Sequence, residues 1–299
     1  MTDELARLVT EQRLPGLQDL DRLSTPDLVR LMNEQDSLVA AAVALAAPRI
    51  AAAVDAIADR MRRGGRLVYI GAGTAGRIGV LDASECAVTF GTTADEVCAL
   101  IAGGPSAMIT AAEGAEDSCE LAVADLTGIG ITEADAVVGI SASGRTPYAV
   151  EALRYAGTAG AFTVGIACNA DSPLGKIADV PIEVVVGPEF VAGSTRLKAG
   201  TAQKLVCNMI STLTMIRVGR TYGDLMVHLT ATNDKLWARA HRLVATITGC
   251  PDELIDGALR QAGGSVTIAS IMLLAGVGPA DARERFASAA GDLRAALAH

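Results

Sequence analysis

The chain has 299 residues, enough for one large domain or two smaller ones with a sizeable core. Its 25 basic and 34 acidic residues give a formal charge of −9. This charge argues against nucleic acid or an anionic membrane as the main partner, because both need a basic face. The hydrophobic fraction is 51%, with only 3% aromatic residues, which is typical of a globular protein with an aliphatic core.

The termini, cysteines and histidines bear on location and metal binding. The first thirteen residues are acidic and amphipathic, unlike a signal peptide, and the longest apolar stretch, 38–47, is too short to span a bilayer. The six cysteines form no CxxC pair, so free thiols in a reducing compartment are expected. The three histidines lack metal-ligand spacing. We therefore expect a cytoplasmic protein without a metal or redox cofactor.

The first sixty residues carry helical signals. A hydroxyl cap followed by proline at 24–27 predicts a helix start, and apolar residues follow at helical spacing. Residues 40–61 are rich in alanine and predict one long helix.

Strand and helix signals then alternate. Five short apolar runs bounded by Gly, Pro, Asn or Ser predict strands at 67–70, 97–101, 136–140, 162–167 and 182–186. Helices are expected between them at 77–82, 105–126, 147–155 and 173–178. This alternation predicts an α/β fold with a doubly wound, five-stranded parallel sheet of the flavodoxin-like type. Ligands should bind beyond the carboxyl ends of the strands.

The last third of the chain is expected to be helical. Residues 195–220 predict one long helix. After about residue 225 the strand signals stop, and short helices are expected at 244–248, 252–261, 266–274 and 280–297. A small C-terminal bundle is the expected arrangement, and no catalytic role is indicated for it.

Two glycine- or hydroxyl-rich loops follow predicted strands. Residues 71–76 have the spacing GxGxxG, but no acidic residue ends the next strand, so a ligand other than a dinucleotide is favoured. The second loop, 141–147, contains three hydroxyls, a glycine and a proline at a helix start. It is either an anion cradle or a simple helix cap, and the motif alone does not decide.

Acidic and basic clusters are the remaining candidates. Asp82 and Glu85 lie three residues apart, and Glu113, Glu116 and Asp117 have the spacing of one helix face. They form either a solvated surface or a pair of carboxylates that serve as acid and base in one pocket. The segment 193–204, with two hydroxyls and two basic groups, is either a capped helix or a second set of ligand contacts.

Taken together, these segments resemble the N-acetylmuramic acid 6-phosphate etherase family. The resemblance rests on the motifs GAGTAGRIGVLDASEC, IAGGPSAM, AAEGAED, SASGRTPY, GPEFVAGSTRLKAGTAQKLVCNMIST and LMVHLTATNDKL. They run in order from about residue 23 to the C-terminus. The resemblance implies a SIS (sugar isomerase) fold, which binds phosphosugars and dimerises. It also implies N-terminal helices over 1–52, a SIS domain over 53–225 and a C-terminal helical domain over 226–299.

The resemblance also implies an activity and its residues. The family removes D-lactate from N-acetylmuramic acid 6-phosphate to give N-acetylglucosamine 6-phosphate. Its functional carboxylates correspond to Glu85, the expected proton donor, and Glu116, the expected base. The expected substrate-binding residues lie in the three loops: Gly73, Thr74, Ser141, Ser143, Thr146 and Ser194. The implied partners are the phosphosugar and a second copy of the chain, with no nucleic acid or membrane, in amino-sugar catabolism and cell-wall recycling.

Two other functions fit the same fold. An aldose–ketose isomerase would use a carboxylate base at C2 but needs no acid at the C3 oxygen. A non-catalytic regulator would sense a phosphosugar and bind another protein. The presence of both glutamates favours the etherase over the regulator.

Overall fold

A computed structural model describes residues 8–110 and 112–298 of the chain. The chain divides into two compact units, Met1–Ser84 with Ala94–Ser211 and Glu85–Thr93 with Thr212–His299. The expected boundaries after residues 52 and 225 stay a prediction. Among the described residues, no helix is long and apolar enough by itself to cross a membrane, and two bent helix pairs pass on length and composition only.

The first unit is built on a five-stranded sheet. Every pair of neighbouring strands is parallel, and the order is β2-β1-β3-β4-β5. The strands are β1 (Leu67–Gly71), β2 (Val97–Ile101), β3 (Ala136–Ile140), β4 (Phe162–Ala167) and β5 (Val180–Glu183). This confirms the doubly wound, five-stranded parallel sheet that the sequence predicted, and the direction of winding reverses between β1 and β3.

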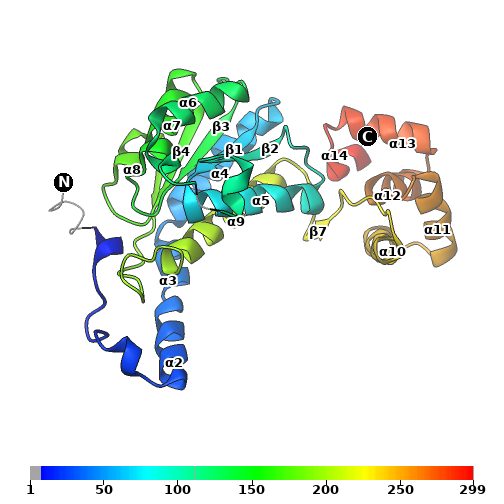
Figure 1. Cartoon of the computed structure of the whole chain (residues 1–299). Helices are drawn as coiled ribbons and strands as arrows, with labels where there is room; N and C mark the ends of the chain where they lie inside the picture. Colours follow the sequence, from blue (N-terminus) through cyan, green and yellow to red (C-terminus); the bar gives the residue numbers. More distant parts are fainter. Residues whose placement is uncertain (1–7, 111, 299) are drawn as a thin grey trace. The chain divides into compact units, whose positions relative to one another are not determined.

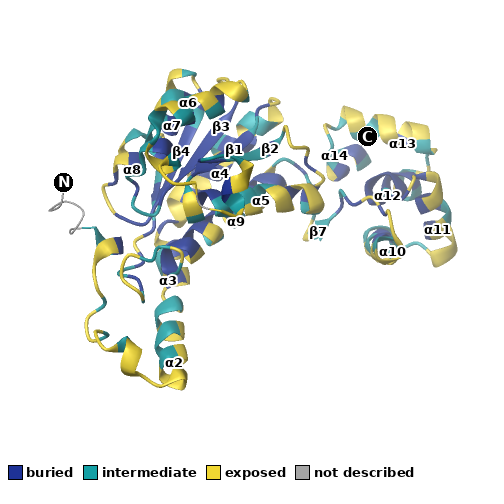
Figure 2. Ribbon diagram, in the orientation of Figure 1, coloured by how far each residue is buried: buried dark blue, intermediate teal, exposed yellow. Residues whose placement is uncertain are grey.

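Helices cover both faces of the sheet, as Figure 1 shows. Every residue of β1 and β3 is buried (Figure 2), which explains why these strands are continuous apolar runs. The helices on one face share a core with β1 and β3 and are α6 (Cys119–Gly128), α7 (Pro147–Thr158) and α8 (Pro173–Ile177). On the other face, Tyr69 of β1 donates a hydrogen bond from its hydroxyl to the carbonyl of Cys207 in α9 (Lys198–Arg217). Tyr69 also contacts the α5 helix (Gly73–Phe90) near Gly79.

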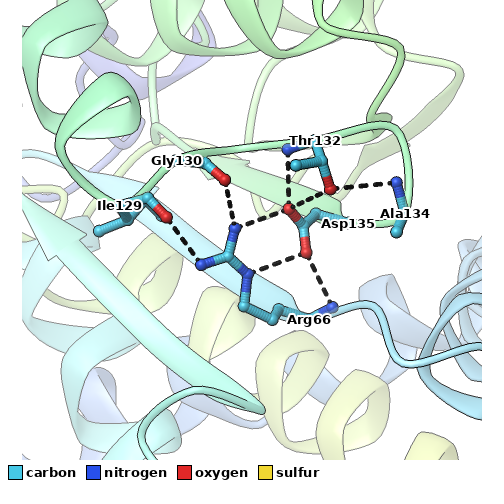
Figure 3. Close-up of polar contacts among 6 residues, drawn as sticks. All are labelled: Arg66, Ile129, Gly130, Thr132, Ala134 and Asp135. Atoms are coloured by element: carbon cyan, nitrogen blue, oxygen red, sulfur yellow. Dashed lines mark hydrogen bonds and ion pairs between the residues drawn. The ribbon is translucent and has the colours of Figure 1, made fainter.

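A partly buried ion pair joins the starts of β1 and β3 (Figure 3). The Asp135 carboxylate accepts hydrogen bonds from the Arg66 guanidinium at 2.7 and 2.9 Å and from the Arg66 backbone N–H at 3.0 Å. It also accepts from the backbone N–H and the hydroxyl of Thr132. The guanidinium donates to the carbonyls of Ile129 and Gly130 as well. The cluster fixes the amino ends of the two strands whose carboxyl ends carry the candidate site.

The N-terminal helices confirm one prediction and correct another. Helix α2 (Thr25–Asp36) begins as expected, with the Ser24 hydroxyl accepting from the backbone N–H of Asp27. The long helix expected over 40–61 is wrong, because α3 (Val39–Leu45) and α4 (Ala47–Arg62) are separate helices. The break precedes Pro48, which lacks an N–H and cannot continue the hydrogen-bond ladder of a preceding helix.

Two further predicted elements differ. Instead of one helix over 105–126, the chain forms the 3-10 turns η3 (Pro105–Met108) and η4 (Ala115–Asp117) before α6. Gly114 has a φ of +73° between them, a left-handed conformation that interrupts a helix. Strand β5 spans Val180–Glu183 rather than 182–186, because its pairing with β4 begins at Val164↔Val180 and ends at Ala167↔Glu183.

The second unit is helical, as expected. Its helices are α10 (Asp234–Thr248), α11 (Asp252–Gln261), α12 (Val266–Ala275), α13 (Pro279–Ser288) and α14 (Leu293–Leu297), and a hairpin joins β6 (Thr221–Tyr222) to β7 (Leu225–Met226). Buried residues of all five helices share one core. The helix expected over 280–297 is two helices, because Ala290 and Gly291 both have positive φ. Asp292 then caps α14 by accepting from Arg294 and Ala295.

Candidate functional site

A cavity of about 450 Å³ lies beyond the carboxyl ends of the parallel strands. Its walls include residues 72–75, which follow β1, and residues 141–147, which follow β3. These strands are neighbours, so the cavity lies where the order of the sheet reverses. This is the ligand-binding position of open α/β sheets, and the volume is in the usual range for small-molecule sites.

The loop after β3 is organised by its own hydroxyl groups. The Ser141 hydroxyl lies 2.8 Å from that of Thr146 and 3.4 Å from that of Ser143, and it accepts from the backbone N–H of Gly144. The Ser143 hydroxyl accepts from the backbone N–H of Arg145. Ser141, Ser143 and Thr146 all line the cavity, but only Ser141 is buried, at 2% exposed. Ser141 therefore holds the turn, while Ser143 and Thr146 are the more accessible hydroxyls.

This turn requires a glycine at position 144. Gly144 has a φ of +67°, and a Cβ placed on it would lie 2.4 Å from the Cβ of Ser172. Helix α7 begins directly afterwards at Pro147, so its N-terminal N–H groups and the hydroxyls face the same end of the cavity. Such an arrangement suits an anion such as a phosphate group without a large positive charge.

The loop after β1 forms the neighbouring wall. Gly73 and Thr74 line the cavity at the start of α5, and Gly73 has a φ of +54°. Gly76 lets this helix approach β1 closely, because a Cβ there would lie 2.6 Å from the carbonyl oxygen of Gly71. The glycines of the GxGxxG segment thus explain the tight turn between strand and helix, with no dinucleotide needed.

Two acidic residues complete the wall near this loop. Glu116 and Asp117 line the cavity, and Glu116 also lines an adjoining hollow of about 200 Å³ with Glu113 and Arg77. The expectation that the three acidic residues share an α-helix face is wrong: Glu116 and Asp117 lie in the short turn η4, and Glu113 precedes it. The structure nevertheless brings Glu116 into one cavity with Ser143, Thr146 and Thr74.

Glu85 is placed differently. It lies on α5, is exposed, and does not line the cavity. It follows Thr74 by eleven positions on the same helix, which at a rise of about 1.5 Å per residue is about 16 Å along the axis. Its neighbour Asp82 is buried instead and accepts hydrogen bonds from Asn208 and Ser211 of α9.

The segment before α9 contributes a third wall. Gly193 and Thr195 line the cavity, whereas the predicted Ser194 between them does not. The start of α9 is capped by the buried Glu189, whose carboxylate accepts from the backbone N–H groups of Lys198 and Ala199 at 2.9 Å each. This cap had no signal in the sequence, because Glu189 lies nine residues before the helix.

Lys198 is a structural residue rather than a ligand contact. It is 1% exposed and donates from Nζ to the side-chain oxygen of Gln35. Burial lowers the pKa of Lys198, and the nearby charge of Glu189 partly opposes this. Within the described part of the chain, no group of three or more His, Cys, Asp or Glu side chains could hold a metal ion.

Glu11 and Gln203 are among the lining residues that were not chosen from the sequence. Glu11 is brought to the cavity by the N-terminal segment, where the Val9 backbone N–H donates to the Asn169 side chain and Asn169 donates to the Thr10 hydroxyl. Gln203 of α9 also lines the cavity. Glu11 had no local signal, whereas Gln203 belongs to a segment that the sequence had marked as a candidate for ligand contacts.

Comparison with known proteins first defines the class. The family model of the SIS domain matches residues 122–213, and that of the glucokinase regulatory protein N-terminal SIS domain matches residues 49–157. A phosphoheptose isomerase from Francisella tularensis shares the fold, with a TM-score of 0.50 and 17% identity, covering 64% of this chain and 100% of that chain. The sheet topology and the position of the cavity, together with these matches, identify the chain as a SIS-domain protein.

Closer relatives then define the family. The chain is 59% identical to the N-acetylmuramic acid 6-phosphate etherase of Streptomyces avermitilis, covering 99% of this chain and 95% of that protein. It is 55% identical to the enzyme of the same name from Rubrobacter xylanophilus, covering 99% of this chain and 98% of that protein. The chain belongs to the N-acetylmuramic acid 6-phosphate etherase family, which confirms the resemblance seen in its motifs.

Proposed function

We propose that this chain is a lyase that removes D-lactate from N-acetylmuramic acid 6-phosphate and leaves N-acetylglucosamine 6-phosphate. The proposal is carried by the identity of 55–59% to etherases over 99% of the chain. In the structure, the hydroxyl-lined turn and Glu116 line the same cavity. The role is in amino-sugar catabolism and cell-wall recycling. The six free thiols favour a cytoplasmic location.

The reaction explains why an acid and a base are needed together. An ether oxygen is a poor leaving group, and C3 of a closed sugar ring is not activated. Once the ring opens, the C1 aldehyde makes the C2 proton acidic. In this proposal Glu116 removes that proton, and Glu85 donates a proton to the departing lactyl oxygen. Water then adds at C3 of the unsaturated aldehyde, so that C–O cleavage and hydration balance without a redox step.

The hydroxyl-lined turn has a separate task in this proposal. Ser143 and Thr146, with the N-terminus of α7, hold the phosphate group. Ser141 keeps their turn in shape through its bonds to Thr146 and Gly144. Binding energy at the phosphate then positions C2 and C3 beside Glu116, so these residues lower the barrier through orientation. Thr74 and the segment around Ser194 would contact the sugar.

In this proposal, a catalytic role for Glu85 calls for a second copy of the chain. About 16 Å of helix separates it from the cavity-lining Thr74. Glu116 acts at C2 of the sugar, and the Glu85 side chain of the same chain is too short to span this distance to the lactyl oxygen on C3. We therefore propose a homodimer in which each cavity receives Glu85 of the partner subunit.

The surface around Glu85 supports this assembly. Leu81 and Val88 are 50% and 71% exposed and lie four residues before and three residues after Glu85, so all three share one face of α5. A second exposed apolar row on α9 consists of Met209, Leu213 and Ile216. Apolar rows of this kind on neighbouring helices are typical of surfaces covered in an oligomer.

The first experiment measures the reaction itself. Purified protein is incubated with N-acetylmuramic acid 6-phosphate in ¹⁸O-water, and D-lactate and the label at C3 are measured. Lactate release with ¹⁸O at C3 is expected. Glu116→Gln and Glu85→Gln should each lower turnover by about 10²- to 10⁴-fold while N-acetylglucosamine 6-phosphate still binds. Interconversion of aldose and ketose phosphates without lactate release would instead identify an isomerase.

A second experiment tests the shared site. Glu85→Gln and Glu116→Gln chains are co-expressed with different tags, so that mixed dimers form. Each mixed dimer then has one site with both glutamates intact, and random pairing should restore about a quarter of wild-type activity. Activity no higher than that of the separate variants would refute a site completed by the partner subunit.

A further inference from the structure

The side chain of Gln203 is buried beside the cavity with part of its hydrogen-bonding capacity unused. Gln203 is 1% exposed and lines the cavity. Its Nε2 is fully buried and has no hydrogen-bond partner within the described residues. A buried amide without a partner is destabilising, so native proteins seldom retain one without a reason.

The surroundings of Gln203 place it among the sugar-contacting loops. It lies in the second turn of α9, three residues after Gly200, and so on the same side of the helix. A Cβ placed on Gly200 would lie 3.6 Å from Cγ2 of Thr74, so this side of α9 faces the loop after β1. Gln203 is therefore an uncharged amide in a cavity whose other polar lining groups are backbone, hydroxyl and carboxylate groups and the guanidinium of Arg145.

We propose that Gln203 is a substrate-binding residue whose amide hydrogen-bonds an uncharged oxygen of the bound phosphosugar. This inference rests on the proposed function and extends it to the sugar portion of the ligand. A neutral amide suits a hydroxyl or amide oxygen, whereas the phosphate is matched by the hydroxyls and helix N-terminus at 141–147. Bound sugar would give the amide the partner that it lacks in the free protein.

The proposal makes two opposite predictions for one substitution. Gln203→Met keeps the length and helix propensity of the side chain but removes the unpaired amide. The free protein should therefore have an unchanged or higher melting temperature. Binding of N-acetylglucosamine 6-phosphate should weaken by roughly 5- to 30-fold, equivalent to about 1–2 kcal/mol at 1.4 kcal/mol per tenfold change. A purely structural residue would not combine these two effects.

Thr214→Val is the matched control. Thr214 lies on the same helix, is 0% exposed, and has an unpartnered Oγ1, but it does not line the cavity. This control should be as stable as the wild type and should bind the sugar phosphate normally. Inorganic phosphate serves as the second probe, because it tests the hydroxyl-lined turn without the sugar and should bind Gln203→Met as it binds the wild type.

Titration calorimetry with both ligands and thermal unfolding without ligand test whether Gln203 binds the sugar. Equal binding of the sugar phosphate by wild type and Gln203→Met would overturn the proposal, and so would an equal loss for inorganic phosphate. A lower melting temperature with a parallel loss of binding would show a structural role and overturn it as well. These results concern Gln203 alone if wild-type protein releases lactate, whereas absence of lactate release and of sugar-phosphate binding would refute both proposals.

Discussion

Removing the carboxylate of Asp135 should destabilise the sheet by about 3 kcal/mol. Replacing one partner of a buried ion pair costs about 3–5 kcal/mol, because the other charge stays in place without compensation. The Asp135 side chain is 3% exposed, but Arg66 is 21% exposed and keeps its bonds to two backbone carbonyls, so the lower end of that range applies to Asp135→Ala. Thr132 would also lose its acceptor.

Urea unfolding followed by circular dichroism measures this loss. The control is Asp59→Ala, which removes an exposed i,i+4 ion pair with Arg63 whose side chains are 60% and 65% exposed. Exposed pairs of this kind contribute less than about 0.5 kcal/mol, so the control should unfold almost as the wild type does. If Asp135→Ala lost no more stability than Asp59→Ala, the buried cluster would not be what holds the strand starts together.

The stability that the Asp135 carboxylate contributes should depend on pH, and it should decrease in acid. Burial alone would raise the pKa of Asp135, but hydrogen bonds from Arg66 and Thr132 outweigh it and lower the pKa below its ordinary value of 3.8. The ion pair therefore makes its full contribution to the free energy of unfolding above the ordinary pKa of Asp135. This contribution is lost as the pH falls through the lowered pKa of the folded protein. The stability gap between wild type and Asp135→Asn should be constant from about pH 7 to pH 5 and should narrow below about pH 4. A gap that widened there would contradict this assignment.

Three further variants test the site and the assembly. Gly144→Ala should weaken binding of N-acetylglucosamine 6-phosphate more than about tenfold, because the added Cβ strains a left-handed residue and meets Ser172; normal binding would argue against the turn as the phosphate site. Thr146→Ala should raise KM with little change in kcat, since the hydroxyl acts in binding; a fall in kcat at unchanged affinity would reverse that role. In the proposed homodimer, Val88→Asp should shift the molar mass measured by light scattering from dimer to monomer, whereas an intact dimer would mean that this face of α5 is not the interface.

Local sequence patterns were sufficient to predict several parts of the molecule. Fully buried strands such as β1 and β3 are apolar along their whole length, so their positions and the parallel sheet could be predicted. Loops at the carboxyl ends of neighbouring strands meet in space, which is why the residues after β1 and β3 could be chosen as site residues. Helix breaks at Pro48 and Gly114 also had local causes, although the patterns around them suggested continuous helices.

Features that join distant segments could not be predicted from local patterns, because they arise from the packing of the folded chain. The cap of Glu189 on α9 and the approach of Glu11 to the cavity depend on how remote segments pack. The same holds for the unpaired amide of Gln203, since partners and burial are properties of packing rather than of one segment. The motifs nominated Glu85 as a catalytic residue. In the structure it lies about 16 Å along α5 from Thr74 and does not line the cavity. Hydrogen bonds and burial act through space, so a local pattern can nominate such residues but cannot position them.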